Sequence, residues 1–263
     1  LLFILAIGPA PAPAADFVFR HDDVMGTSLE LNVRADDEAA ARGAEERALR
    51  EIDRLSAVFS NHDAGSEFRR WQGGGKGAVK VSPELLEVLA ASDAWRERSA
   101  GAFDPRVQVF AELWADAAAR GREPTPAEKD AARSRAAAPA WRLDSAAGTA
   151  ERLSDVPLTL DAVAKGYVVE KACDAAMQGD PAVRGVILNV GGDLRVRGDV
   201  EHRLAIAGPR EGSETTEPLA WISVKDRAVA ASGPKHRNYQ VEGRRRSHVI
   251  DPRTGEPADA IAL

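Results

Sequence analysis

One apolar run, Val186-Ile187-Leu188-Asn189-Val190, constrains the fold more than any other segment of the chain. Its length and composition are typical of a strand buried on both faces, and Gly191-Gly192-Asp193 ends it with a turn. Shorter strand-like runs follow, separated by glycine, proline and charged residues, at 203–207, 220–224, 228–231, 238–241 and 247–250. The second half of the chain is therefore expected to be rich in strands.

The N-terminal region begins with alternating apolar and polar residues and then changes period. Residues 17–20 and 28–33 alternate on either side of Met25-Gly26, which predicts a half-buried hairpin. A helix capped by Asp36 or Asp37 then follows, because its apolar residues recur at spacings of three and four as far as Phe59.

Two further helical segments are predicted before the strand-rich half. Ser82-Pro83 is a favourable helix start, since proline at the first helical position lacks only an N–H that has no helical partner. Residues 104–137 are rich in alanine and are expected to be helical with a break at Pro124 and Pro126. Helices in the first half and strands in the second predict an α+β fold.

Composition limits the classes of function. With 263 residues, 44% of them apolar, the chain can bury a large core as one large or two small domains. The single Cys173 excludes an intramolecular disulfide and a zinc ribbon, because each needs at least two thiols. Forty-one acidic residues against thirty-five basic ones give a net charge of −6, so no nucleic-acid partner is expected.

The two ends of the chain suggest processing and truncation. Residues 1–15, LLFILAIG followed by small residues and prolines, are interpreted as the remnant of a signal peptide, which predicts export to the periplasm. The alternative is that these residues form a buried first strand or a loose tail. The apolar run LLFILAIG is too short to cross a bilayer as a helix. Residues 16–263 are expected to form the functional domain, with part of its C-terminus missing after the apolar ending Asp259-Ala260-Ile261-Ala262-Leu263.

Common signatures of phosphate and metal sites are absent from the sequence. There is no GxxxxGK[ST], GxGxxG, HExxH or GxSxG, which excludes a P-loop, a dinucleotide fingerprint, a zincin site and a nucleophile elbow in their usual forms. Any catalytic site must therefore come from less familiar clusters.

Two clusters combine an acidic residue with a helix start. In Gly101-Ala102-Phe103-Asp104-Pro105, Asp104 is either a helix N-cap followed by proline or a carboxylate aimed at a ligand. Asp161 opens a helix after a short apolar strand, and the first amides of that helix together with Lys165 would bind an anion. The alternative for this second cluster is a capped helix with a solvent-directed lysine.

The last cluster, residues 248–255, has the sequence HVIDPRTG. It places His248 on a predicted strand, and an Asp-Pro turn follows that Thr254-Gly255 would close. A surface hairpin would have the same pattern. Ala231-Ser232-Gly233, another short cluster, is by itself a turn after a strand.

Taken together and in order, the clusters resemble the ApbE family of FAD:protein FMN transferases. The resemblance runs from about Phe17 to the end of the chain. Its motifs are Met25-Gly26-Thr27, Ser66-Glu67, Gly101-Ala102-Phe103-Asp104-Pro105, Ala164-Lys165-Gly166-Tyr167, Asn189-Val190-Gly191-Gly192-Asp193, Ala231-Ser232-Gly233 and residues 248–255.

The resemblance implies an exported enzyme that binds FAD and Mg²⁺. Such an enzyme cleaves the FAD pyrophosphate, joins FMN by a phosphoester bond to a Thr or Ser of a target flavoprotein, and releases AMP. Membrane association would arise only through the target. The alternatives are an FAD pyrophosphatase that makes FMN and AMP, and a periplasmic flavin-binding protein without catalysis.

The resemblance also implies roles for individual residues. His248 would be the catalytic residue that transfers a proton or orients a phosphate, and the backbone carbonyl of Ala164 would be a metal ligand. The residues expected to bind FAD are Met25, His62, Ala102, Phe103, Asp104, Asp161, Lys165, Ile250, Asp251 and Thr254.

Three departures from the family pattern affect these expectations. His62 stands where many members have a tyrosine, so the stacking of a tyrosine ring on the ligand is lost or replaced by an imidazole. Leu158 occupies the usual acidic position, for which Asp161 is the expected substitute. The D-A-x-x-T motif that supplies side-chain metal ligands in the family is not matched by residues 259–263, and Mg²⁺ held without it would be bound weakly.

Overall fold

The computed structural model describes residues 14–206, 218–231 and 238–258, which form two compact units. The first unit contains the described parts of Leu1–Ile52, Val169–Leu204 and Trp221–Ala230. The second contains those of Asp53–Val168, Ala205–Ala220 and Ala231–Leu263. The proposed signal peptide at residues 1–15 lies almost wholly outside the described residues, as do residues 259–263.

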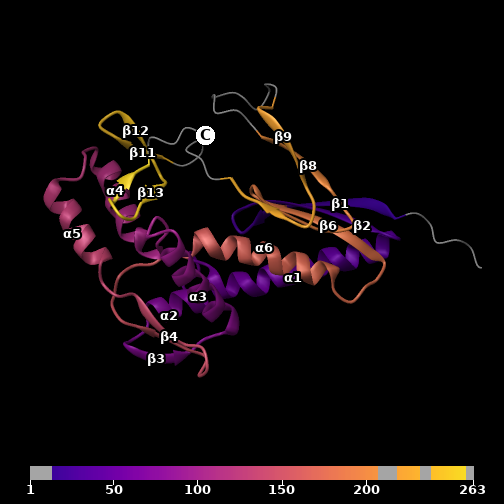
Figure 1. Cartoon of the computed structure of the whole chain (residues 1–263), viewed down its shortest axis with the longest axis horizontal. Coiled ribbons are helices and arrows are strands. Elements are labelled where there is room, and N and C mark those ends of the chain that lie inside the picture. The colour runs from indigo at the N-terminus through magenta and orange to yellow at the C-terminus, as the bar shows by residue number, and fades with distance from the viewer. Residues whose placement is uncertain (1–13, 207–217, 232–237, 259–263) are drawn as a thin grey trace, which may run out of the picture. The chain divides into compact units, whose positions relative to one another are not determined.

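A five-stranded antiparallel sheet forms the centre of the first unit (Figure 1). Its strand order is β1(Ala15–Val24), β2(Thr27–Ala35), β6(Val183–Val190), β7(Asp193–Gly198) and β10(Ala228–Val229). The predicted hairpin around Met25-Gly26 is confirmed as β1 and β2, and the apolar run that begins at Val186 is confirmed as most of β6.

Two helices cover one face of this sheet, where they lie side by side in Figure 1. In the first unit, α1(Glu38–Phe59) contacts α6(Asp161–Met177) through Arg47, which donates to the carbonyls of Ala175 and Ala176 at 3.1 and 2.9 Å. The helix predicted from Asp36 or Asp37 is confirmed, with the Asp37 side chain accepting from the amide of Ala40.

The other face of the sheet packs against a second hairpin. Leu194, Val196, Val200 and Val224 form a buried cluster there. Val224 belongs to β9(Ala220–Val224), which pairs with β8(His202–Ile206). β6 is fully buried on the face of Val186 and Leu188, whereas Ile187 on the opposite face is only partly buried. The prediction that this strand is buried on both faces is thus confirmed for one face, whereas the other face is only partly buried.

Helices dominate the second unit. They are α2(Glu67–Gln72), α3(Pro83–Arg98), the 3₁₀ turn η1(Pro105–Val107), α4(Gln108–Arg120) and α5(Pro126–Ala136). Ser82 caps α3 as predicted, with its hydroxyl accepting from the amide of Leu85 at 3.2 Å. The predicted break near Pro124 and Pro126 is the connection between α4 and α5.

The strands of the second unit are short. β3(Gly77–Lys80), β5(Thr149–Arg152) and β4(Trp141–Asp144) form a three-stranded antiparallel sheet that the sequence patterns did not predict. The second unit also contains two separate hairpins. One pairs β11(Asn238–Val241) with β12(Arg244–Ser247), and the other pairs β13(Ile250–Asp251) with β14(Glu256–Pro257). The strand predicted over 247–250 was wrong as one element, because the chain bends at His248 between β12 and β13.

The short strand expected just before Asp161 was also wrong. Leu158 and Leu160 are buried, but the backbone there pairs with no strand. The amide of Leu158 instead donates to the side chain of Gln72 at 2.7 Å, and that of Thr159 to the carbonyl of Pro105 at 3.0 Å. The segment is therefore held in place by single contacts to two neighbouring elements.

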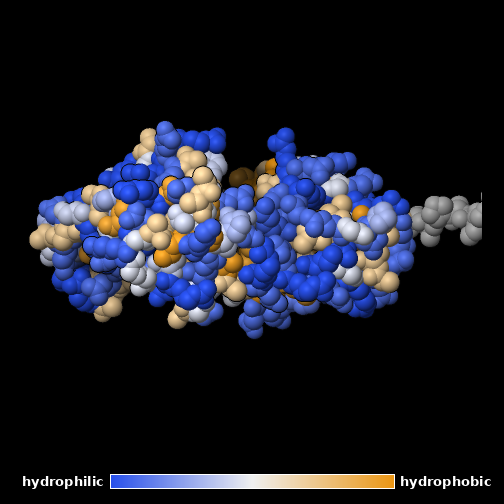
Figure 2. Space-filling view, turned by 90° about the horizontal axis from the view of Figure 1, so that it is seen from below, coloured by the Kyte–Doolittle hydropathy of each residue, from blue (hydrophilic) through white to orange (hydrophobic). Residues whose placement is uncertain are grey.

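Among the described residues, no helix is both long enough and apolar enough to cross a membrane. On the face that Figure 2 shows, hydrophobic residues occur in small separate groups among hydrophilic ones.

Candidate functional site

A series of hydrogen bonds joins two of the sequence clusters to the segment of His62 within the second unit. Asn61, next to His62, donates to the carboxylate of Asp161 at 2.5 Å and to the hydroxyl of Thr159 at 3.3 Å. Thr159 in turn bonds through its amide to the carbonyl of Pro105, which follows Asp104. The structure thus brings His62, the start of α6 and the Gly101–Pro105 segment close together, although they are far apart in sequence.

Asp104 is the electrostatic centre of this region. It is 8% exposed, caps η1 by accepting from the amide of Arg106, and forms ion pairs with Arg96 at 2.9 Å and Arg106 at 2.5 Å. Burial alone would raise the pKa of Asp104, but the hydrogen bonds and charge of Arg106, helped by Arg96, hold it below its usual value. The capping interpretation of Asp104 is confirmed, and both of its oxygens already have guanidinium partners.

The turn that follows Asp251 meets the Asp104 region. A pocket of about 270 Å³ is lined by residues of both segments, including Gly101, Asp104, Pro252 and Arg253. The turn closes as predicted, because the amide of Gly255 donates to the carbonyl of Asp251 at 2.8 Å. The side-chain hydrogen bond from Arg253 holds the pKa of Asp251 below its usual value.

Ile250 and Thr254 differ in accessibility. Ile250 is buried in β13, whereas Thr254 is exposed at the turn, where its hydroxyl accepts from the amide of Glu256 at 3.2 Å. Ala102 is also exposed, and Phe103 is half-buried with its amide bonded to the hydroxyl of Ser99.

His248 lies in a bend instead of the predicted strand. Its side chain is half-buried, and its Nδ1 is a buried atom without a hydrogen-bond partner among the described residues. A buried ring nitrogen without a partner costs stability, which is a common feature of residues kept for function.

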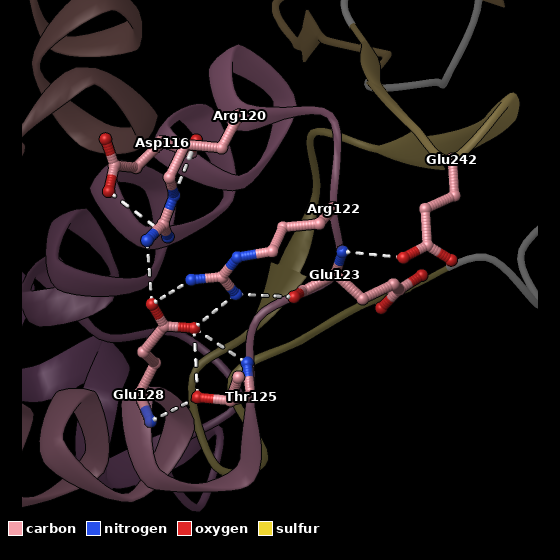
Figure 3. A network of polar contacts seen from close by, with 7 residues as sticks. All are labelled: Asp116, Arg120, Arg122, Glu123, Thr125, Glu128 and Glu242. Atoms are coloured by element: carbon pink, nitrogen blue, oxygen red, sulfur yellow. Dashed lines mark hydrogen bonds and ion pairs between the residues drawn. The ribbon is translucent and has the colours of Figure 1, made fainter.

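A polar network fixes the hairpin that leads to His248 (Figure 3). Glu123 lies in the connection between α4 and α5, and its carboxylate pairs with Arg246 of β12. The backbone amide of Glu123 donates to the carboxylate of Glu242, at the hairpin turn, at 3.3 Å. Glu128 closes a capping box with Thr125 and pairs with Arg120 and Arg122 at 2.7 and 2.8 Å. The hydrogen bonds from these arginines and from Thr125 hold the pKa of Glu128 far below its usual range.

The start of α6 is less open to an anion than the sequence suggested. Both the Val163 and Ala164 amides donate to the carbonyl of Leu160, at 2.9 and 2.8 Å, and the Asp161 amide donates to the Thr159 hydroxyl. The expectation that the first amides bind an anion is therefore corrected, because three of them already have acceptors. Lys165, one turn further along and half-buried, is the remaining cation for this role.

Met25 belongs to the first unit. It occupies the two-residue turn between β1 and β2, has a φ of 52°, and is 38% exposed. Gly26 follows with a φ of 72°. This left-handed pair is the geometry of a tight hairpin turn, in which asparagine is preferred at the position that Met25 holds.

The described side chains do not form a metal centre. No group of three or more His, Cys, Asp or Glu residues among them could hold an ion. The carbonyl of Ala164 lies in the first turn of α6, where the partial positive charge of a helix N-terminus disfavours a cation.

Sequence reasoning missed several residues that organise this region. Asn61 connects the clusters, Arg106 neutralises Asp104, and Trp114 donates from its indole to the carbonyl of Gly255 at 2.9 Å. Only Asn61 had a signal, namely its position beside His62. The two others act through tertiary contacts that no local pattern contains.

The close packing of Gly255 leads to a testable prediction. Its φ is 73°, and a Cβ there would lie 2.5 Å from the Phe110 ring. We expect Gly255→Ala to destabilise the protein by about 2–4 kcal/mol, the combined cost of left-handed backbone and overpacking. Urea denaturation would measure this loss. Gly243→Ala has the same backbone penalty and open space, so it should cost less; equal losses would contradict the packing argument.

Comparisons with known proteins agree with this fold. The ApbE family model matches residues 25–262. The FAD:protein FMN transferase of Rhodobacter capsulatus is 31% identical over 96% of this chain, and that of Salmonella typhimurium is 24% identical over 94%. The chain spans about half the length of the first relative (48%) and 72% of the second.

Solved structures show the same architecture. The ApbE protein of Thermotoga maritima superposes with a TM-score of 0.78 at 27% identity, over 93% of this chain and 79% of that one. The flavin transferase ApbE of Vibrio cholerae has a TM-score of 0.74 at 23% identity, with the same coverage. The fold is thus the α+β fold of the ApbE structures. The chain belongs to the ApbE family.

Proposed function

We propose that this chain is an FAD:protein FMN transferase. The observation that carries the proposal is the hydrogen-bonded series of Asn61, Asp161, Thr159 and Pro105 in the second unit, which brings together the neighbouring His62 and Asp104. The chain is also a member of a family whose relatives carry that name. The substrates are FAD and a target flavoprotein with an acceptor Thr or Ser.

In the proposed reaction, the acceptor hydroxyl oxygen attacks the FMN phosphorus of the FAD pyrophosphate. A new P–O bond forms to the acceptor, the P–O bond to the AMP half breaks, and AMP leaves with the electron pair. His248 accepts the hydroxyl proton at Nε2, since Nδ1 is buried. The AMP phosphate takes up a proton from solvent, and His248 releases the hydroxyl proton to solvent, which balances the step and restores the neutral imidazole.

FAD contains flat rings and a charged pyrophosphate, so its site needs apolar surface and cations. Met25, Ala102, Phe103 and Ile250 are proposed for the flavin, and Lys165 for the phosphates or adenine. Asp161, His62, Asp251 and Thr254 are proposed for the polar groups. Asp104 would contribute through the placement of Arg96 and Arg106, because these arginines occupy its oxygens.

The test is mass spectrometry of a peptide with a D-G-A-T-like segment, incubated with the protein, FAD and Mg²⁺, with AMP and free FMN quantified alongside. A gain of FMN mass on the peptide threonine with an equal amount of AMP is the expected result. AMP with only free FMN would replace the proposal with an FAD pyrophosphatase. Intact FAD would leave a flavin-binding protein.

Lys165 provides a separate test of the FAD site. Lys165→Ala is expected to weaken FAD binding by about fivefold to tenfold, the typical value of one charge-assisted contact in a half-buried position. Fluorescence quenching of FAD would give the Kd. Lys171→Ala, on the same helix, is the control and should leave the Kd unchanged. An unchanged Kd in Lys165→Ala would remove this residue from the site.

Mg²⁺ is proposed as the accompanying cation on the strength of the family resemblance. When bound, it would neutralise the pyrophosphate and polarise the phosphoryl group. We expect FAD cleavage to stop in excess EDTA and to return on addition of Mg²⁺. A rate that EDTA does not change would show that the chain works without a divalent cation.

Export to the periplasm is likewise a proposal, based on the apolar start of the chain and the resemblance. Fractionation of cells that express the full gene would locate the protein. Recovery in the cytoplasm would overturn this part of the proposal.

A further inference from the structure

A second cavity lies in the second unit, at the small sheet and away from the clusters described above. It has a volume of about 310 Å³ and is formed by the end of α2, the glycine-rich segment after it, and strands β3 and β5. None of the motif residues except Glu67 lines it. The proposed flavin chemistry therefore does not account for this cavity.

The charges around the cavity are unbalanced. Arg70, Lys80 and Arg152 line it together with one acid, Glu67. The carboxylate of Glu67 is already engaged, because it accepts from the amide of Ser82 at 2.6 Å. Within the described part of the chain, none of the three cations forms an ion pair with a carboxylate. The lining thus has a net charge of +2.

Arg152 is the most unusual of these cations, because it is only 4% exposed. Its guanidinium lies 5.3 Å from the centre of the Trp71 ring and donates to the carbonyl of Val156 at 2.6 Å, whereas its buried Nε has no partner. Burial lowers the pKa of Arg152, and the charge of Asp155 offsets only part of that effect. A buried cation without an anionic partner is costly, and an anion in the adjacent cavity would reduce that cost.

Open backbone completes the cavity. A side-chain carbon added at Gly75 or Gly77 would meet no atom within 4 Å. The glycine-rich segment therefore leaves free volume beside the cations, where a ligand can approach the backbone closely.

We propose that this cavity binds a phosphate group, either free phosphate or the phosphate of a small monoester. A phosphate monoester has a charge of about −1.5 to −2 at neutral pH, which matches the net charge of the lining better than a carboxylate does. The exposed side chains of Arg70 and Lys80 contact the phosphate oxygens, and the buried guanidinium of Arg152 adds positive potential from the interior wall of the cavity.

Isothermal titration calorimetry with inorganic phosphate at low ionic strength tests the proposal. We expect saturable binding at one site that weakens as salt is added. Arg70→Gln and Lys80→Gln should each raise the Kd about threefold to fivefold, because both side chains are exposed, and the double variant should lose measurable binding.

Matched controls come from the same segment. Arg69→Gln and Lys76→Gln remove exposed charges beside Arg70 and near Lys80 that do not line the cavity, and neither should change the Kd. Equal weakening in all four single variants would overturn the proposal, since it would show a general charge effect. Unchanged binding in the Arg70 and Lys80 variants would place the phosphate elsewhere and overturn it as well.

Two further titrations define the ligand. Glycerol 3-phosphate binding at least as tightly as inorganic phosphate would indicate a monoester, and weaker binding would indicate free phosphate. Acetate binding as tightly as phosphate would overturn the choice of a phosphate group. FAD cleavage measured in the Arg70 and Lys80 variants is expected to be normal, so that this proposal and the proposed transferase activity fail or succeed separately.

Discussion

Replacing His248 with alanine is expected to lower the rate of FMN transfer about a hundredfold or more, because general base catalysis typically contributes at least this factor. FAD binding should stay within about twofold of the wild-type value. The structure supports a chemical role, since His248 is half-buried in a bend and its Nδ1 has no partner among the described residues. A histidine kept only for packing would be expected to satisfy that nitrogen.

The measurement separates chemistry from binding. Single-turnover transfer to the peptide gives the rate, and fluorescence titration gives the FAD Kd. Transfer at the full rate in His248→Ala would exclude the role, and loss of FAD binding together with transfer would make His248 a binding residue.

His21→Ala is the matched control. His21 lies on β1 in the first unit, where its Nε2 contacts Glu45 at 2.8 Å. The substitution removes an imidazole and its partly exposed contact with Glu45. Because His21 is not among the residues proposed for the site, the rate of FMN transfer should be unchanged. Reduced transfer in this control would point to a general loss of structure, which thermal unfolding of both variants would detect.

Asp104→Asn is expected to be the second large effect, this time on stability. The substitution keeps the shape of the side chain and removes its charge, so the largely buried Arg106 loses the counterion to which it is hydrogen-bonded. Breaking a buried pair typically costs about 3–5 kcal/mol, and the half-exposed Arg96 reduces this figure because water can solvate it. We therefore expect a loss of about 2–3 kcal/mol in urea denaturation.

The contribution of the Asp104–Arg106 pair should also appear in the dependence of stability on acidic pH. The pKa of Asp104 is lower in the folded protein than its reference value of 3.8. Its contribution to stability is therefore fully present above that value and is lost as the pH falls through the folded pKa. The wild type should lose more stability than the variant below about pH 4.

Asp130→Asn serves as the control for this prediction. Asp130 pairs with Arg133 at 2.6 Å, but its side chain is 72% exposed, so the loss should be below about 0.5 kcal/mol. If Asp104→Asn were as mild as the control while FAD binding disappeared, Asp104 would be a ligand-binding carboxylate and its ion pairs would be secondary.

The sequence predicted those elements whose causes are local. Ser82-Pro83 combines a cap with a proline at the first helical position, and the structure begins α3 there. The alternation around Met25-Gly26 and the apolar run at Val186 correspond to β1, β2 and β6. In each case the residues that decide the structure lie within a few positions of one another.

The missed elements depend on contacts between distant segments. The four-residue strands β3, β4 and β5 are too short to show periodicity, and they are stabilised by pairing with one another and by Trp71, whose indole donates to the carbonyl of Ala150 at 3.3 Å. Residues 158–160 resembled a strand because they are apolar, yet the partner of the Leu158 amide is the side chain of Gln72. Apolar composition predicted their burial but could not predict their hydrogen-bond partners.

The candidate site was predicted as a set of residues but not as an electrostatic arrangement. The clusters were identified in order, and two of them, at Gly101–Pro105 and at Asp161, meet beside His62 through Asn61 and Thr159. The arginines that occupy Asp104 and the acceptors that occupy the amides at the start of α6 were not foreseen, because both arise from the packing of separate segments.

The turn between β1 and β2 offers an opportunity for protein engineering. Met25 holds a left-handed backbone conformation that disfavours its own side chain, next to Gly26, which adopts that conformation freely. A laboratory search for heat-resistant variants would be expected to select asparagine or glycine at this position. Met25 is 38% exposed and is one of the residues proposed above to bind the flavin. Thermostable selections should therefore be screened for flavin binding before they are accepted as improvements.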